Sequence, residues 1–225
     1  MAQPTKRVCL SWSGGKDCAW ALKLLREDPD VEVVNLLTTF DSKFDFVNMT
    51  TITRKLLRAQ ASAAGLPVRE IDLPNPCPNT EYSAIMTRVT DKLRDEGITH
   101  IAFGDLFLED VRKYREQNLT GTGLEAMFPN WQLDTNQLAK EMIASGVKAY
   151  TVSVDGRKLD PSFVGQEFDQ HFLDKLPEGV DHCGENGEFH SFAFAGPMFH
   201  RQLSVQPGQR FQRDGFWYAD VYPDE

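Results

Sequence analysis

The first half of the chain alternates short apolar runs with longer amphipathic stretches. The short runs are rich in branched side chains and are bounded by glycine, proline or polar residues, which is typical of buried strands. In the longer stretches apolar residues recur every three or four positions, which predicts helices with one buried face. The predicted strands are 8–12, 31–38, 67–73 and 98–103, and the predicted helices are 17–26, 53–64 and 80–96. This alternation predicts an α/β fold built on a parallel twisted sheet with flanking helices.

Two of these helices carry recognisable end signals. Gly65 follows the second helix, and glycine readily adopts the left-handed conformation that ends helices. Thr80 opens the third helix, where a hydroxyl can cap free backbone N–H groups. We therefore expect the second helix to stop at Gly65 and the third to be capped by Thr80.

The second half of the chain is less regular and predicts a smaller α+β lobe. A helical stretch near 135–145 precedes an apolar run near 148–154 that predicts a strand. Residues 189–221 then read as extended segments joined by turns. The predicted turns are at Gly196-Pro197, Pro207-Gly208 and Asp214-Gly215. We divide the chain into a domain of residues 1–118 and a lobe of residues 119–225.

Composition and charge exclude several classes of function. The chain has 225 residues, 41% hydrophobic and 25% charged, as in ordinary globular proteins. Its formal net charge of −9 makes nucleic acid an unfavourable partner. The local basic stretch 54–58 is interpreted as the solvated face of a helix.

The cysteines and the chain start indicate a cytoplasmic protein. The 4 cysteines contain no CxxC pair, which argues against a disulfide framework and a four-thiolate zinc site. Residues 1–7 lack the apolar segment of a signal peptide, and no run approaches the ~20 apolar residues needed to span a bilayer. We expect no contact with membranes.

The most specific local motif is SWSGGKDC at residues 11–18, between a predicted strand and a predicted helix. Paired glycines allow a tight turn, while the N–H groups of the helix start and the Lys16 ammonium favour an anion. The common P-loop pattern does not fit, because Leu10 and Asp17 stand where it requires glycine and Ser or Thr. The alternative is a glycine turn with an exposed lysine and a capping aspartate. We also expect the thiol of Cys18, at a helix N-terminus, to be slightly acidified.

Polar residues also follow the fourth predicted strand. Gly104 and Asp105 end it at the carboxyl edge of the sheet, where open α/β folds bind ligands, so Asp105 can face a nucleotide or Mg²⁺. A plain turn is the alternative. Arg112 and Arg115 follow on a helix, where they can meet phosphate or simply pair with neighbouring glutamates.

A second motif, CGENGEFHS at residues 183–191, packs acidic, amide and imidazole groups between glycines. Glu185 and Glu188 can hold Mg²⁺ or ammonium, Asn186 can orient a carboxylate or amide, and His190 can move a proton near neutral pH. A polar turn that opens a hairpin is one alternative. Another is a zinc site of His182, Cys183 and His190, although their spacing lacks the usual paired ligands.

Both motifs resemble known families. SGGKD at 13–17 resembles the pyrophosphate-loop motif of the adenine nucleotide α-hydrolase-like superfamily, with Cys18 in place of its usual serine. The second motif resembles the GENGEFHT signature of the diphthine–ammonia ligase family, with Ser191 in place of threonine. Further similarity lies at 103–110, 114–116 and 127–131, so that the resemblance covers nearly the whole chain. Asn130 and Gln132 depart from the leucine and glycine usual there.

The resemblance implies a Rossmann-like fold and an AMP-forming ligase that uses ATP and Mg²⁺. In its reaction a carboxylate attacks the α-phosphate, and ammonia then displaces AMP from the acyl-adenylate. The predicted ATP-binding residues are Ser11, Ser13, Gly14, Gly15, Lys16, Asp17, Cys18, Gly104 and Asp105. The predicted substrate-binding residues are Arg115, Trp131, Gly184, Glu185, Asn186, Gly187 and Glu188. Catalysis is assigned to Lys16, Glu185, Glu188 and His190, and Mg²⁺ to Asp17 and Asp105.

The resemblance leaves the substrate open. The family's substrate is diphthine on elongation factor 2, but the motifs at 103–110 and 183–190 look closer to bacterial relatives, which favours a small-molecule or other carboxylate as the alternative. Two further hypotheses are a tRNA-modifying pyrophosphate-loop enzyme, disfavoured by the acidic charge, and a non-catalytic nucleotide-binding module. A homodimer is an open possibility for its assembly.

Overall fold

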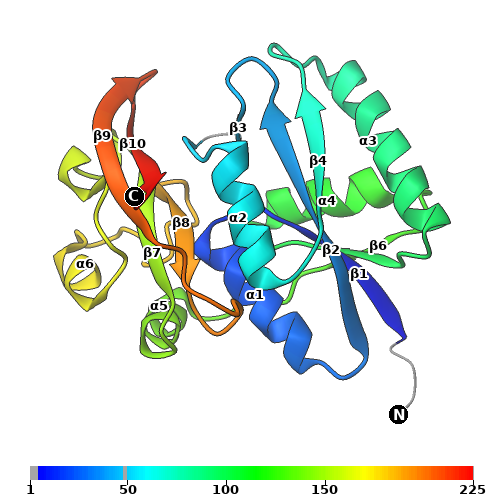
Figure 1. The fold of residues 1–225 in the computed structure, drawn as a ribbon, viewed down its shortest axis with the longest axis horizontal. Helices are drawn as coiled ribbons and strands as arrows, with labels where there is room; N and C mark the ends of the chain where they lie inside the picture. The colour runs from blue at the N-terminus through cyan, green and yellow to red at the C-terminus, as the bar shows by residue number, and fades with distance from the viewer. Residues whose placement is uncertain (1–4, 48–49, 225) are drawn as a thin grey trace.

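A parallel sheet forms the centre of the N-terminal half, as the sequence predicts. Within residues 5–47 and 50–224, which the computed structural model describes, its five parallel strands lie in the order β4-β2-β1-β5-β6 (Figure 1). Their bounds are β1 (Lys6–Ser11), β2 (Val31–Asp41), β4 (Val68–Leu73), β5 (His100–Ala102) and β6 (Glu125–Met127). The short β3 (Phe46–Val47) pairs antiparallel with the end of β2. Residues 1–4 of the N-terminal segment lie outside the described residues.

Helices cover both faces of this sheet. α1 (Lys16–Glu27) and α2 (Arg54–Ala64) lie on the face toward the second lobe, and α3 (Asn79–Asp95) and α4 (Glu109–Leu119) lie on the other (Figure 1). Because side chains alternate along a strand, Val8 and Leu10 of β1 join the core with α1 and α2, whereas Cys9 joins the core with α3. Both faces of β1 are thus buried, which explains its uninterrupted apolar sequence.

The connections create a crevice at one edge of the sheet. The chain runs from β1 outward to β2 and β4, then returns through α3 to β5 on the other side of β1. The strand order therefore reverses between β1 and β5, and ligands of open α/β sheets bind outside the carboxyl ends of such strands. The residues at these two ends are Trp12 and Ser13 after β1, and Phe103 and Gly104 after β5.

The second lobe is an antiparallel sheet with its own helices. Strands β7 (Lys148–Asp155), β8 (Phe189–Ala195), β9 (Val205–Arg213) and β10 (Phe216–Pro223) lie in the order β8-β7-β10-β9. α5 (Thr135–Ala144), the 3-10 turn η1 (Pro161–Phe163) and α6 (Gln170–Lys175) accompany it. The predicted fold class is confirmed. The proposed boundary after residue 118 stays a prediction, and β6, which pairs with β5, lies beyond it.

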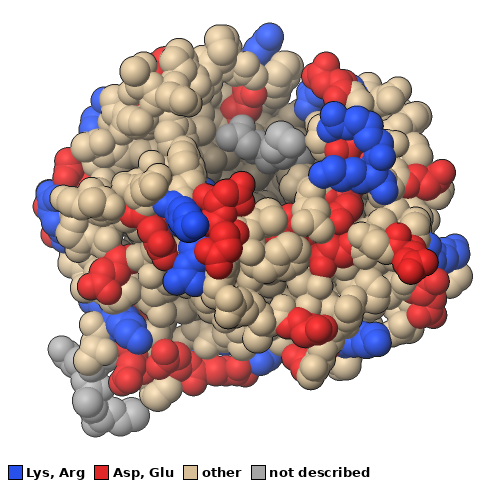
Figure 2. Space-filling model, turned by 180° about the vertical axis from the view of Figure 1, so that it is seen from behind, with Lys and Arg blue, Asp and Glu red and all other residues tan. Residues whose placement is uncertain are grey.

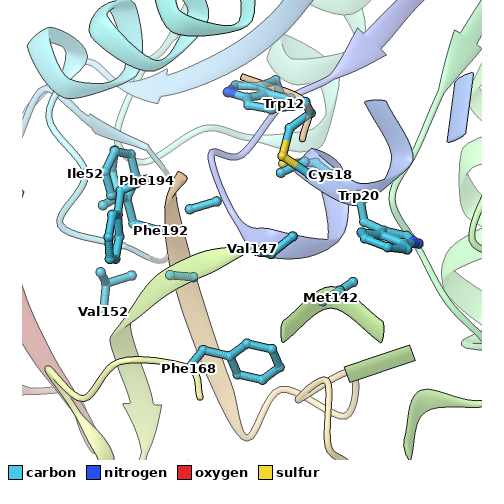
Figure 3. Packing of buried hydrophobic residues seen from close by; sticks show 14 of the residues in the cluster. Trp12, Cys18, Trp20, Ile52, Met142, Val147, Val152, Phe168, Phe192 and Phe194 are labelled. Carbon is cyan, nitrogen blue, oxygen red and sulfur yellow. The ribbon is translucent and has the colours of Figure 1, made fainter. Parts of the chain in front are cut away.

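One continuous apolar core joins the two lobes. Trp12 and Cys18 from the β1–α1 region pack in the same buried cluster as Val152 of β7 and Phe192 and Phe194 of β8 (Figure 3). The Trp12 ring also meets Phe199 edge to face, with ring centroids 6.4 Å apart. The start of α1 is therefore held between both sheets.

Two local predictions were wrong. The hydroxyl of Thr80 does not cap α3, because the helix starts one residue earlier with Pro78 at its N-cap. The Pro207-Gly208 pair is not a turn but part of β9, which is an edge strand, where the missing N–H of a proline leaves no ladder bond unmade. The turns at Gly196-Pro197 and Asp214-Gly215 are confirmed.

Charges on the surface are interspersed rather than segregated. Acidic and basic side chains lie among one another across the face in Figure 2. In the basic stretch of α2, Arg54 pairs with Glu70 and Asp72, and Arg58 pairs with Glu70, so acidic neighbours balance its charge. No helix in the described part of the chain has the length and apolar character needed to cross a membrane.

The helix ends allow a direct test of the local analysis. The hydroxyl of Thr53 caps α2 by accepting from the backbone N–H of Leu56, whereas Thr80 is exposed and does not cap α3. Thr53→Ala should lower the free energy of unfolding by about 1 kcal/mol. Thr80→Ala is the matched control and should change it by less than about 0.5 kcal/mol. Urea denaturation measures both, and an equal loss in the two variants would contradict the assigned caps.

Candidate functional site

The loop between β1 and α1 is tied to the second lobe through its backbone. Gly14 has φ 82°, a left-handed conformation that favours glycine. Its carbonyl oxygen accepts two hydrogen bonds, one from the backbone N–H of Ala193 at 2.9 Å and one from the side chain of Gln60 at 2.8 Å. Hydrogen bonds from β8 and α2 therefore fix the β1–α1 loop.

Gln60 is a site residue that the sequence analysis missed. Its side chain on α2 is fully buried, accepts from the indole N–H of Trp12 at 2.7 Å, and donates to the carbonyls of Gly14 and Ala193. Both N–H donors of the amide and one lone pair of its oxygen are therefore used in hydrogen bonds. A polar residue on the apolar face of α2, beside Leu56, Leu57 and Ala61, was the available signal.

Lys16 lies at the start of α1 with a buried side chain. Its ammonium donates to Asp17 Oδ2 at 3.0 Å and to the carbonyl oxygen of Cys183. The rings of Phe168 and Phe189 lie 5.4 and 5.0 Å away. Burial lowers the pKa of Lys16, but the neighbouring Asp17 carboxylate outweighs burial and raises it overall. The ammonium is therefore charged and faces the second motif.

The prediction of an acidified Cys18 thiol was wrong. Burial raises the pKa of Cys18, because the thiol lies inside the core, 3.4 Å from the Ser13 hydroxyl and 3.1 Å from the Gly15 carbonyl oxygen. Desolvation of the thiolate outweighs the favourable field of the helix terminus. Cys18 therefore packs the loop and is not a reactive group.

The end of β5 approaches the loop closely. A Cβ atom added to Gly104 would lie 2.9 Å from the backbone nitrogen of Cys18, so this contact requires glycine. The fully buried Asn130 joins the two segments, since its side-chain amide donates to the carbonyls of Asp17 at 2.9 Å and Gly104 at 3.1 Å. Asn130 is thus a second residue whose structural part the sequence analysis missed.

Four polar atoms beside the loop have no hydrogen-bond partner among the described residues. Three are Asp17 Oδ1, Asp105 Oδ2 and Arg115 Nε, all buried, and Asn130 Oδ1 is a fourth buried atom there without a partner. The Asp105 and Arg115 atoms form an ion pair at 3.5 Å without a hydrogen bond. An unpaired buried polar atom costs about 1–3 kcal/mol, so these atoms fit a site that a ligand completes.

A cavity of about 440 Å³ opens beside the loop at the carboxyl edge of the parallel sheet. Ser11 and Ser13 line one end of it, and Phe103 and Arg115 line another part. The wall from α3 was missed by the sequence analysis, although its residues stand at helical spacing i, i+3, i+4 and i+7. They are Ser83, Met86, Thr87 and Thr90.

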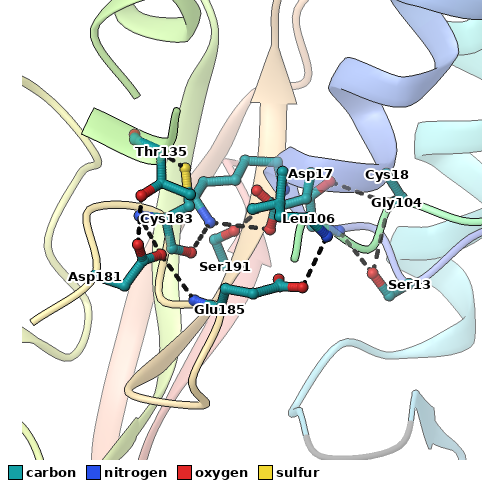
Figure 4. A network of polar contacts seen from close by, with 12 residues as sticks. Ser13, Asp17, Cys18, Gly104, Leu106, Thr135, Asp181, Cys183, Glu185 and Ser191 are labelled. Carbon is teal, nitrogen blue, oxygen red and sulfur yellow. Dashed lines mark hydrogen bonds and ion pairs between the residues drawn. The ribbon is translucent and has the colours of Figure 1, made fainter. Parts of the chain in front are cut away.

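The second motif forms a tight loop directly opposite the first (Figure 4). Asp181, which precedes the motif, closes the loop because its Oδ1 accepts from the backbone N–H groups of Cys183 and Glu185, both at 3.0 Å. Gly184 has φ 73° and packs against Phe189, and Gly187 has φ 79°. The importance of Asp181 was not predicted. The loop of residues 181–191 is called the acceptor loop below.

Glu185 reaches from the acceptor loop to the parallel sheet. Its Oε1 accepts from the backbone N–H of Leu106 at 2.8 Å. Burial, together with the nearby Asp17 and Asp105 carboxylates, raises the pKa of Glu185 to about 7. A carboxyl group with such a pKa can both accept and release a proton at neutral pH.

The other acidic and imidazole groups of the motif are placed differently. Glu188 is buried, and its Oε1 accepts from Asp181 N at 3.1 Å and from Asn186 Nδ2 at 3.2 Å, so it holds the acceptor loop together. Burial lowers the pKa of His190 to about 4. His190 is therefore uncharged at neutral pH, which is a correction to its expected role as a proton carrier there.

Arg115, Arg112 and Trp131 differ in their relation to the cavity. The Arg112 guanidinium stacks over the Trp131 ring at 4.7 Å and pairs with Glu116, as one of the two alternatives proposed. Trp131 is not among the residues that line the cavity, whereas Arg115 is. Among the residues that the structure describes, no three His, Cys, Asp or Glu side chains gather to hold a metal, and this includes the His182, Cys183 and His190 set.

Comparisons with known proteins agree with the two motifs. Residues 134–222, which carry the acceptor loop, match the model of the diphthamide synthase C-terminal domain. The diphthine–ammonia ligase of Rattus norvegicus is 25% identical over 96% of this chain and 88% of its own length. That of Danio rerio is 25% identical over 86% of this chain and 84% of its own length. That of Homo sapiens is 30% identical over 56% of this chain and 48% of its own length.

The chain is therefore similar to diphthine–ammonia ligases over nearly its whole length. These relatives are ligases by name. The similarity of the chain to the rat protein covers both lobes, which agrees with the contacts that join the β1–α1 loop to the acceptor loop.

Two departures from the family pattern now have a structural account. Asn130 replaces an apolar residue with a side chain that bonds the ends of two segments, as described above. Gln132 stands where the family usually has glycine, and it keeps a left-handed backbone with φ 61°. Its N–H donates to the carbonyl of Leu106 at 2.7 Å, which holds this conformation.

The buried thiols predict the order of chemical modification. Burial raises the pKa values of Cys18 and Cys183, and it raises that of Cys9 to about 12, whereas Cys77 is partly exposed. Since the thiolate is the reactive form, iodoacetamide at neutral pH should label Cys77 first and the other thiols only after unfolding. Peptide mass spectrometry measures the order. Rapid labelling of Cys18 in the folded protein would contradict the buried position assigned to it.

Glu185 predicts a specific dependence of stability on pH. Its carboxyl pKa rises from 4.5 to about 7 on folding, so the stability it contributes is present below 4.5 and is lost as the pH rises through 7. Relative to Glu185→Gln, the parent should lose about 3 kcal/mol of unfolding free energy between about pH 4.5 and pH 8. Urea denaturation of both proteins measures this difference, in which all other titrating groups cancel. A difference that does not change with pH would show that Glu185 is not desolvated.

Proposed function

We propose that the protein adenylates a substrate carboxylate with ATP and then transfers ammonia to it, releasing AMP. The observation that carries the proposal is the direct apposition of the two motifs. Glu185 of the acceptor loop bonds the backbone just after β5, and Ser191 Oγ accepts from the backbone N–H of Lys16 at 3.1 Å. A group activated at the first motif is thus within reach of the second.

In this proposal the cavity binds the adenosine and the loop binds the phosphates of ATP. The adenosine occupies the cavity between the sheet edge and α3, where apolar walls such as Met86 and Phe103 alternate with hydroxyl groups. The phosphates lie at residues 13–15 near the N-terminus of α1, whose dipole favours negative charge. Arg115, at the cavity wall with an Nε that makes no hydrogen bond, neutralises charge on the phosphates.

Asp17 and Asp105 fit a Mg²⁺ ion that accompanies ATP. Each presents a buried carboxylate oxygen without a partner, and carboxylate oxygens are ligands that Mg²⁺ prefers. Two carboxylates suffice when nucleotide phosphates and water supply the other ligands. When bound, the ion would neutralise the leaving pyrophosphate.

The proposed reaction has two steps. An oxygen of the substrate carboxylate forms a bond to the α-phosphorus, the α–β bond breaks, and pyrophosphate leaves. Ammonia then attacks the acyl carbon of the adenylate, AMP leaves, and the nitrogen loses one proton. Glu185 accepts that proton, since its carboxyl group lies at the junction of the motifs and its pKa is about 7.

The test is an assay of AMP and amide formation. The protein is incubated with α-labelled ATP, Mg²⁺ and ammonium, with diphthine-bearing elongation factor 2 or with a cellular small-molecule extract. We expect AMP release that depends on one of these carboxylates. Glu185→Gln should lower amide formation by about 10²-fold while AMP-forming adenylation, trapped with hydroxylamine, changes by less than about threefold. The exposed Glu178→Gln is the matched control with unchanged rates.

Comparing AMP formation with the elongation factor and with the extract identifies the substrate. AMP formed only with the elongation factor identifies the diphthine reaction, and AMP formed only with the extract identifies a small-molecule acid. Binding of ATP without AMP formation under any condition would overturn the proposal and favour a nucleotide-binding module.

A further inference from the structure

Two of the three N–H donors of the Lys16 ammonium are taken by protein acceptors. The Lys16 side chain is 1% exposed, two of its N–H groups bond Asp17 Oδ2 and the Cys183 carbonyl, and the rings of Phe168 and Phe189 enclose the rest. Lys16 is also not among the residues that line the cavity, whereas Ser11, Trp12 and Ser13 are. The ammonium therefore points away from the nucleotide and into the second lobe.

Lys16 also contacts both ends of the motif at residues 183–191. The ammonium of Lys16 fixes the carbonyl of Cys183, two positions before Glu185, and its backbone N–H donates to Ser191 Oγ at 3.1 Å. Glu185 N is fixed to the same turn through Asp181. The position of Glu185 thus depends on where Lys16 stands.

Lys16 is also linked to the nucleotide side. Its ion-pair partner Asp17 has a second carboxylate oxygen, Oδ1, that is buried and unpaired beside the loop. A cation that binds this oxygen together with the phosphates would pull on the Asp17 carboxylate. Because the same carboxylate is paired with the Lys16 ammonium, the cation would also affect the position of Lys16.

We propose that Lys16 is a positioning residue that couples an occupied nucleotide loop to the geometry of the acceptor loop, rather than a ligand of the phosphates. The catalytic consequence rests on the proposed function: Glu185 is positioned to accept the proton from ammonia only when ATP is bound. The coupling itself is a property of the folded chain and can be measured without turnover.

The experiment compares the parent with Lys16→Met, whose apolar side chain of similar length still packs between Phe168 and Phe189. Binding of a non-hydrolysable ATP analogue with Mg²⁺ is measured by calorimetry, and amide exchange of residues 181–191 is followed by mass spectrometry with and without the analogue. In the parent, the analogue should slow exchange of 181–191 by about threefold or more. In Lys16→Met this protection should vanish, while analogue affinity changes by less than about threefold.

Two further variants separate coupling from general damage. Lys23→Met removes another lysine of α1 that lies over an aromatic ring, 4.7 Å from Trp20, and it should retain the parent's protection. Ser191→Ala removes the second link to Lys16 and keeps the ammonium, so it should lower the protection partially even if Lys16→Met does not fold. Protection of α3 residues 79–95 by the analogue reports that the cavity is still occupied.

Each outcome decides one question. A loss of analogue affinity of about tenfold or more in Lys16→Met would make Lys16 a phosphate ligand and overturn the proposal. Unchanged protection of 181–191 in both Lys16→Met and Ser191→Ala would overturn it as well. Failure of the parent to bind the analogue would instead contradict the proposed function.

Discussion

The structure depends on the anchoring of the β1–α1 loop by the second lobe. The Gly14 carbonyl accepts hydrogen bonds from Ala193 and Gln60. The side chain and the backbone of Lys16 both form hydrogen bonds with the acceptor loop. These polar bonds lie inside an apolar core, where breaking one partner leaves the other unsatisfied and costs more than in water. The loop is therefore held in one conformation, with its outer side satisfied by protein and its inner side open toward the cavity.

This anchoring explains why the second lobe belongs to the same catalytic unit. The loop lies at the point where the order of the parallel strands reverses, which is a property of the first lobe alone. Yet Glu185, the carboxyl group with the most useful pKa, comes from the acceptor loop and is desolvated because it is pressed against Leu106 and the Asp17 and Asp105 carboxylates. The chemistry is thus built at the contact between lobes.

The balance of satisfied and unsatisfied groups separates structural from ligand-facing residues. Gln60 is fully buried and bonds Trp12 and the carbonyls of Gly14 and Ala193. Asn130 donates to the carbonyls of Asp17 and Gly104 but keeps its own Oδ1 without a partner. Asp17, Asp105 and Arg115 each keep a buried polar atom without a partner at the same place. Since such atoms are costly unless a ligand completes them, Gln60 shapes the site and the residues that keep such atoms fit its ligand.

The sequence alone determined the parallel α/β domain, most element positions and the two chemical motifs. Apolar periodicity, glycine at a strand-to-helix turn and dense polar groups between glycines are local properties, and these local properties carry the family resemblance as well. Only the tertiary structure decided the direction of the Lys16 ammonium, the raised pKa of the Cys18 thiol and the uncharged state of His190. It also decided the parts played by Gln60 and Asp181. These depend on desolvation and on partners far away in the chain, which no local pattern encodes.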